Sequence, residues 1–91
     1  MIYVDSLKNN GWVLRGRHIK NCHLYGDSNE ELINFAEKIG LNKEWMQKSR
    51  SGIRHFDITA KFRKKAIEIG AVEIRGKEFI KRILNRNYLP I

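Results

Sequence analysis

Glycines divide this chain of 91 residues into short segments, and their spacing constrains the fold more than any other feature. They lie at Gly11, Gly16, Gly26, Gly40, Gly52, Gly70 and Gly76. Glycine commonly ends helices and strands, because it adopts backbone conformations that other residues avoid. We therefore expect strands to end at Gly16 and Gly26, and helices to end at Gly40 and Gly70.

Three strands are expected in the first part of the chain. Met1-Ile2-Tyr3-Val4 alternates and is rich in β-propensity, and it ends at Asp5. Residues 12–15 and 21–25 are the second and third strands, because both are apolar or aromatic segments that end at a glycine.

The clearest helix begins at Asp27 or Ser28, either of which can cap it, and ends at Gly40. Glu30 or Glu31 follows at the spacing of a capping box. One apolar face runs along this helix: Leu32, Phe35, Ala36 and Ile39.

The second half of the chain mixes short helices with one further strand. A helical turn is expected over 42–46, a basic loop over 47–54 and an ambiguous segment over 53–58. Asp57 or Thr59 can cap a helix that ends at Gly70. A strand over 71–74 and a helix over 78–85 complete the prediction.

Together these elements predict a single α/β domain over residues 1–91, with a small sheet of three to four strands packed with three to four helices. Apolar residues make up 42% of the chain, and no window is long and apolar enough to span a membrane. The start of the sequence has no signal-peptide pattern, and Cys22 is the only cysteine, so a soluble cytoplasmic protein is expected. One cysteine and three histidines do not favour a closed zinc site, so no metal is predicted; the cofactor is left open.

The net charge of +8 favours a polyanionic partner, namely a nucleic acid, a nucleotide or an acidic protein. Residues 43–65 carry +6 of this charge, whereas residues 1–42 are balanced. The predicted ligand-binding residues accordingly lie around this central segment: Trp45 for stacking, and Arg50, Arg54, Lys61, Arg63 and Lys64 for charge.

Familiar cofactor and catalytic motifs are absent, among them GxGxxG, the Walker loop, HExxH and GxSxG. His55 and Asp57 lie two residues apart and would point the same way if the segment is extended, so they could act together on a phosphate or a metal. Asp57 could instead cap the next helix while His55 bonds to the backbone. His23, on the third expected strand, is the other candidate catalytic residue, although a lone histidine is often structural.

An ordered set of motifs resembles a family of small phage and bacterial proteins that is uncharacterised and begins with a Met-Ile-Tyr-Val-Asp strand. The residues that carry the resemblance span nearly the whole chain: Met1 to Asp5, His23-Leu24, Asp27-Ser28, Glu30 to Leu32, Phe35-Ala36, Ile39 to Leu41, Trp45, His55 to Ile58, Ala66 and Gly70-Ala71. The resemblance implies no established activity, but it directs attention to His23, Trp45, His55 and Asp57. The basic character of residues 43–65 departs from the family pattern.

These observations rank three functions, and whether the chain is an enzyme is left open. The first is a binding module for a phosphate-bearing ligand, nucleic acid or nucleotide. The second is a small hydrolase or nuclease in which His23, His55 and Asp57 converge, with a divalent metal optional. The third is a phage accessory protein that binds and inhibits a host protein, with its basic face against an acidic partner. Convergence of the two histidines in space would favour the enzyme.

Overall fold

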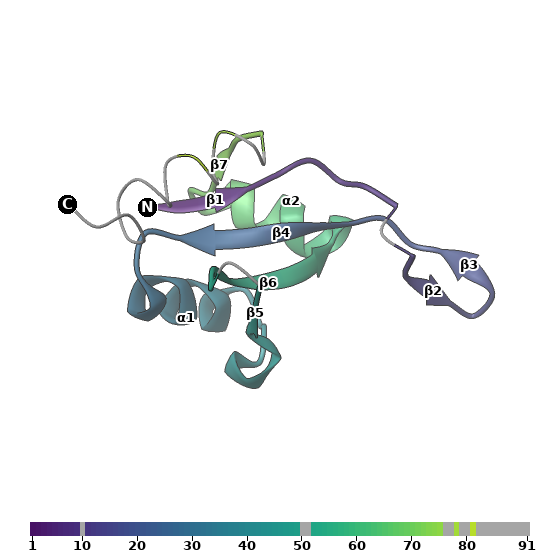
Figure 1. Cartoon of the computed structure of the whole chain (residues 1–91), viewed down its shortest axis with the longest axis horizontal. Coiled ribbons are helices and arrows are strands. Elements are labelled where there is room, and N and C mark those ends of the chain that lie inside the picture. Colours follow the sequence, from purple (N-terminus) through teal and green to yellow (C-terminus); the bar gives the residue numbers. More distant parts are fainter. Residues whose placement is uncertain (10, 50–51, 76–77, 79–80, 82–91) are drawn as a thin grey trace.

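A five-stranded mixed sheet forms the centre of the molecule (Figure 1) in a computed structural model that describes residues 1–9, 11–49, 52–75, 78 and 81. The strand order is β5-β6-β4-β1-β7. In chain order these strands are β1 (Ile2–Val4), β4 (Asn21–Gly26), β5 (Gln47–Lys48), β6 (Arg54–Thr59) and β7 (Val72–Glu73). β1 and β7 are parallel, and the other neighbouring strands are antiparallel.

A separate two-stranded sheet lies between β1 and β4 in the sequence. It consists of β2 (Val13–Leu14) and β3 (Arg17–His18), joined by a two-residue turn. Arg15 and Gly16 both have positive φ, 52° and 78°. Two successive positive φ values characterise the turn that matches the twist of a tight hairpin. The expected strand over 12–15 is therefore the first half of a hairpin.

Two α-helices and one short 3-10 helix are present among the described residues. α1 (Asn29–Lys38) is capped by Ser28, whose hydroxyl accepts a hydrogen bond of 3.1 Å from the Glu31 amide. Gly40 follows with φ 91°, as the predicted stop requires. α2 (Ala60–Glu68) begins after Thr59, and η1 (Lys43–Trp45) is the expected helical turn.

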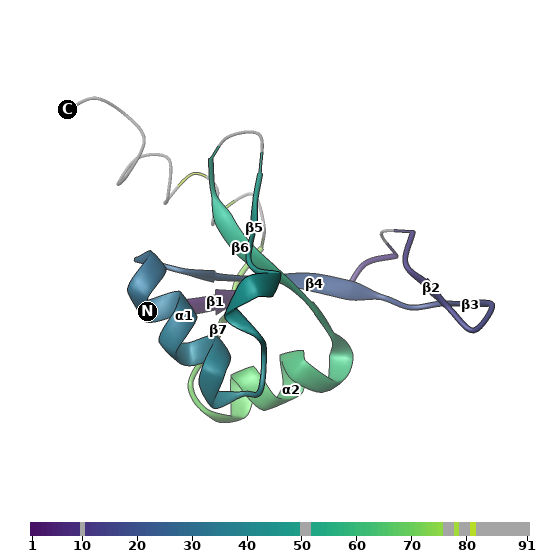
Figure 2. The same ribbon diagram turned by 90° about the horizontal axis from the view of Figure 1, so that it is seen from below.

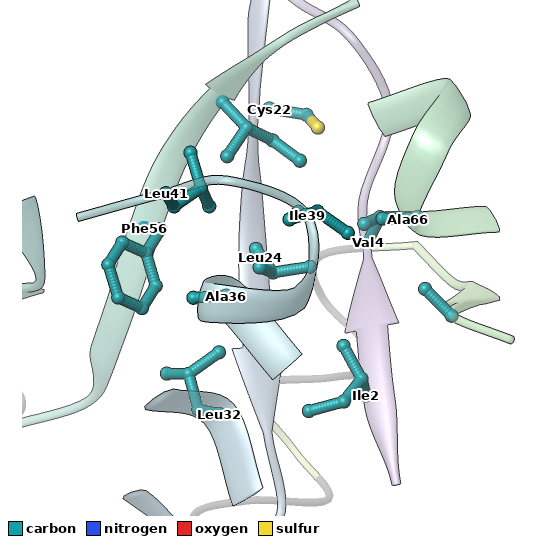
Figure 3. Packing of buried hydrophobic residues seen from close by; sticks show 12 residues of the cluster. Ile2, Val4, Cys22, Leu24, Leu32, Ala36, Ile39, Leu41, Phe56 and Ala66 are labelled. Carbon is teal, nitrogen blue, oxygen red and sulfur yellow. The ribbon is translucent and has the colours of Figure 1, made fainter. Parts of the chain in front are cut away.

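Both α-helices pack on the same face of the sheet, where the main core lies (Figure 3). The strands contribute Ile2, Val4, Cys22, Leu24, Phe56 and Ile58 to this core, and the helices contribute Leu32, Ala36 and Ala66. Burying a side chain of the size of Leu or Phe stabilises the fold by about 1.5–3 kcal/mol. This face therefore supplies most of the hydrophobic stabilisation.

The prediction of three to four strands packed with three to four helices is wrong, because the protein is dominated by its sheets. Gln47–Lys48 lies in the expected basic loop but forms the edge strand β5, and most of the ambiguous segment 53–58 belongs to the long strand β6. Residues 42–46 form only a 3-10 turn. Short strands such as β5 carry little sequence signal, since pairing with a neighbour decides them.

The helix expected over 78–85 falls largely outside the described residues. Among the residues that the structure does describe, no helix combines the length and apolar character needed to cross a bilayer.

Candidate functional site

Alternation along the strands places a second set of side chains on the face of the sheet away from α1 and α2. In a strand, successive side chains point to opposite faces. The residues between the core positions therefore share the other face: Tyr3, Asp5, His23, Tyr25, His55 and Asp57. Tyr3 and Tyr25 pack there with Ile53, Val72 and Ile74. The polar members lie together beside this smaller apolar cluster.

Pairing between three neighbouring strands places one carboxylate on each side of a histidine. His23 on β4 pairs directly with Asp57 on β6. On its other side lies Asp5, which follows β1 and donates its backbone amide to the His23 carbonyl at 3.3 Å. The result is a row Asp5, His23, Asp57 across the sheet, with His55 two residues from Asp57 on the same face.

Asp5 fixes the orientation of the His23 ring. Its Oδ1 accepts the backbone amide of His23 at 2.6 Å, and its Oδ2 lies 2.7 Å from His23 Nδ1. A carboxylate only accepts hydrogen bonds, so Nδ1 must donate. In a neutral His23 ring, Nε2 then carries a lone pair and faces Asp57.

The backbone carbonyl of Ile53 does the same for His55. His55 Nδ1 lies 3.2 Å from this oxygen. Because a carbonyl cannot donate, Nδ1 donates, and the Nε2 atom of a neutral His55 also carries a lone pair. The side chain of His55 is buried, so this tautomer is held inside the fold.

Three ligand atoms therefore converge. Asp57 Oδ1 lies 3.5 Å from His23 Nε2 and 3.7 Å from His55 Nε2, and all three atoms lie within 4.8 Å of one another. Ligand atoms around a tetrahedral zinc, at about 2.0–2.1 Å from the metal, are separated by about 3.3 Å. The two distances from Asp57 Oδ1 need only a small contraction to reach this value, whereas the two Nε2 atoms, up to 4.8 Å apart, would have to approach each other by up to about 1.5 Å. Three electron-pair donors this close together also favour a cation between them.

The electrostatics of His23 agree with a site for positive charge. The hydrogen bond to Asp5 raises the pKa of His23 above its usual value, and the charges of Asp5 and Asp57 add to this effect, while burial opposes it. A proton and a metal ion therefore compete for the same Nε2 atom.

Two neighbouring residues that could carry chemistry are kept protonated. Cys22 precedes His23 but points into the core, and burial raises the pKa of its thiol to about 12. Tyr25 lies with its ring centroid 5.5 Å from that of His23, and burial, with the charges of Asp5 and Asp57, raises the pKa of its phenol. Neither residue supplies a thiolate or phenolate nucleophile at neutral pH.

The structure tests the capping role that was one of the two predictions for Asp57. Thr59 occupies the N-cap position of α2, although its side chain makes no capping hydrogen bond, and Asp57 lies within β6 facing the histidines. The capping role for Asp57 is therefore wrong. The backbone contact expected for His55 is present, but this side chain also reaches the cluster.

The predicted ligand-binding residues do not surround this cluster. Lys61, Arg63 and Lys64 belong to α2, which packs on the opposite face, and Arg54 shares the face of Phe56. Arg63 donates to the Asp5 carbonyl at 3.0 Å and to Glu73 at 2.8 Å. Trp45 is 57% exposed on η1, so it is not a core residue. Arg50 lies outside the described residues.

Sequence reasoning missed the role of Asp5 as the partner of His23. In the sequence, Asp5 is marked only as the residue at which the first expected strand ends. The pairing of β1 with β4 was the information needed, because this register alone brings positions 5 and 23 together.

Comparison with known proteins identifies one family. No curated protein and no solved structure is significantly similar to the chain. A family model described as "Protein of unknown function (DUF4031)" matches residues 2–86, and this range includes Asp5, His23, His55 and Asp57. The chain therefore belongs to this family of unknown function.

Proposed function

We propose that the protein is a metal-dependent hydrolase whose metal is held by His23, His55 and Asp57. The observation that carries this proposal is the convergence of two imidazole Nε2 atoms and one carboxylate oxygen, with both Nδ1 protons already used in other hydrogen bonds. Two histidines and one carboxylate form one of the standard ligand sets of catalytic zinc.

The donor set supports an open metal site. Three protein ligands leave a coordination position for water, whereas structural zinc sites use four. In the part of the chain that the structure describes, the side chain of His23 is 34% exposed, so solvent reaches the cluster. Asp5 would act as the carboxylate behind a metal-bound histidine, an arrangement that orients the ring and raises its basicity.

A metal at this position would supply hydrolytic chemistry. His23, His55 and Asp57 would hold it, and Asp5 would orient the His23 ring. Such a metal would lower the pKa of a bound water to about 7 and so provide a hydroxide nucleophile near neutral pH. In a hydrolysis of this kind water would add to the substrate, and the leaving oxygen would take up the proton that the water gives up.

This proposal departs from the prediction that no metal is bound. That prediction counted the four cysteine and histidine ligands of a closed site and left out a carboxylate as a ligand. Two histidines from different strands and one aspartate are sufficient for an open site.

Zinc binding tests the proposal directly. Isothermal titration of the purified chain with Zn²⁺ should give one site, and the zinc-loaded protein should hydrolyse bis-p-nitrophenyl phosphate. His55→Ala and Asp57→Asn should each weaken zinc binding by about 100-fold or more, since even outer-shell partners contribute about 10–100-fold. Glu37→Gln, an exposed carboxylate change on α1, is the matched control and should bind as the parent does.

Two results would contradict the proposal. One is the absence of zinc binding by the parent protein at neutral pH. The other is zinc binding that Asp57→Asn and Glu37→Gln leave equally unchanged, because the metal would then lie elsewhere.

A further inference from the structure

The two-stranded sheet β2–β3 forms an arm, here defined as residues 11–20, that projects from the start of β4 away from the body (Figures 1 and 2). None of the arm's described residues belongs to either hydrophobic cluster. Val13 and Leu14 point to opposite faces of the ribbon, yet they are 57% and 61% exposed. Neither face of the arm is therefore covered by the rest of the described chain.

The arm and its base form the longest stretch of the chain with positive charge only. No acidic residue occurs between Asp5 and Asp27, whereas Lys8, Arg15, Arg17 and Lys20 lie in this interval. The arm thus presents a net charge of +3, and Lys8 adds one more where it pairs with Asn21 at the base.

Apolar and aromatic side chains accompany these charges. Leu14 pairs with Arg17, and Trp12 accepts the amide of Ile19 at 2.9 Å through its backbone carbonyl. Antiparallel pairing therefore places Trp12 and Leu14 on the same face as Arg17. An isolated two-stranded hairpin is only marginally stable in water, so an arm with uncovered apolar side chains gains from a partner that covers them.

We propose that this arm binds double-stranded DNA, largely independently of sequence. A two-stranded ribbon fits the major groove of B-form DNA, which is about 12 Å wide. The arm projects from the body and carries positive charge at its tip and its base, which suits a groove with a phosphate backbone on each side. Proteins that bind single strands use grooves or channels instead, and the major groove of duplex RNA is too narrow for side chains to read.

This inference extends the proposed function, because DNA can be the substrate only if the protein is a hydrolase. The binding of DNA by the arm does not itself require the metal. A duplex held by the arm would give the centre at His23, His55 and Asp57 a phosphodiester as the bond to hydrolyse. DNA binding and metal binding involve different residues, so they can be tested separately.

Fluorescence anisotropy with a labelled 20-base-pair DNA duplex in EDTA measures binding without hydrolysis. The test variant is Arg15→Asn with Arg17→Gln, because asparagine tolerates the positive φ of position 15 and suits this turn type. Removing two phosphate contacts should reduce the slope of log affinity against log salt by about 2 and weaken binding at 50 mM salt by about 10-fold or more. Trp12→Ala should weaken binding without changing the slope.

The matched control removes the same charge from the other candidate surface. Lys61→Gln with Lys64→Gln lies on α2, within the central basic segment, and both side chains are exposed. We expect this variant to keep the parent slope to within about 0.5, because no phosphate contact is lost. The Arg15→Asn, Arg17→Gln protein should still bind Zn²⁺ and hydrolyse bis-p-nitrophenyl phosphate, and Asp57→Asn should still bind DNA.

Several outcomes would overturn the inference. Among them are an α2 variant that loses as much affinity as the arm variant, and an arm variant that binds as the parent does. Tighter binding to single-stranded DNA or to duplex RNA would do the same, as would affinity that does not change with salt. A protein that binds duplex DNA through the arm but neither binds zinc nor hydrolyses the phosphodiester would overturn the hydrolase alone.

Discussion

The two faces of the central sheet are built from alternate residues of the same strands, yet their chemistry differs. Even-numbered positions Val4, Cys22, Leu24, Phe56 and Ile58 pack under the helices, whereas odd-numbered positions Asp5, His23, His55 and Asp57 face away from them. One face buries apolar surface against α1 and α2. The other has a smaller apolar cluster around Tyr3 and Tyr25, and beside it lie polar groups that stabilise the fold only weakly.

Along a single strand, alternate residues therefore serve different ends: one set stabilises the fold, and the other forms the proposed metal site. Replacing a buried apolar residue by a histidine gives up hydrophobic stabilisation, and a buried polar group must also find partners. His55 meets that requirement with the Ile53 carbonyl and then presents its other nitrogen to Asp57. The open face is therefore where changes should alter metal binding, and the covered face is where they should alter folding.

The largest expected effect is on the covered face. Phe56→Ala should lower the free energy of unfolding by about 3–5 kcal/mol, because it leaves a cavity in the core. Its neighbour His55→Ala should cost only about 1–2 kcal/mol, since it removes one hydrogen bond to the Ile53 carbonyl, which still accepts the Ser49 amide at 2.9 Å. Urea denaturation of the two variants in EDTA gives both values. Equal decreases in the free energy of unfolding would mean that His55 is a structural residue. The two faces would then not differ in their contributions to stability and to metal binding.

The second effect is stabilisation by metal. At a zinc concentration of 100 times Kd, the free energy of unfolding of the parent should rise by about 2.7 kcal/mol. If Asp57→Asn weakens binding 100-fold, the same zinc concentration should raise it by only about 0.4 kcal/mol. Denaturation with and without zinc measures both gains. In Phe56→Ala, zinc should raise the free energy of unfolding by the same amount as in the parent. A smaller increase in this variant would show that the two faces are not independent.

The smallest effect concerns protonation. Because the pKa of folded His23 is raised, mainly by Asp5, its protonation adds stability that is fully present below the unfolded pKa of about 6.5 and is lost as pH rises through the folded pKa. Asp5→Asn keeps an oxygen that can accept the His23 amide but removes the charge. The variant should therefore lose stability against the parent mainly at acid pH, and the pKa of His23 should fall towards its ordinary value.

Titration of the His23 ring by NMR, together with urea denaturation at several pH values, tests this prediction. The same substitution should also weaken zinc binding by about 10–100-fold, as expected for a residue that positions a ligand. An unchanged His23 pKa would contradict the role given to Asp5.

Local patterns were sufficient to predict several elements. The helix from Ser28 to Gly40 could be predicted because its cap, its apolar spacing and its stop all lie within a few residues of one another. β4 was predicted for the same reason, with its end at Gly26. β5 could not be predicted, since a two-residue edge strand exists only through its pairing with β6.

The basic character of the arm was not predicted, because the charges of residues 1–42 were counted together. Residues 1–42 are neutral as a block, but the basic residues concentrate between Asp5 and Asp27 and the acidic ones gather in and around α1. A finer reading of charge along the chain would have found this stretch. Its projection from the body is a tertiary property.

By itself, the sequence determined the alternation of apolar and polar residues on the strands, and hence that His55 and Asp57 share a face. Only the tertiary structure decided that this face also carries Asp5 and His23, because those residues are far from His55 in the chain and meet through strand pairing. The register between strands depends on packing of the whole sheet, and shifting one strand by a single residue would turn its side chains to the other face. For that reason His23, His55 and Asp57 could be named from the sequence as candidate catalytic residues, but only the strand pairing brings their side chains together.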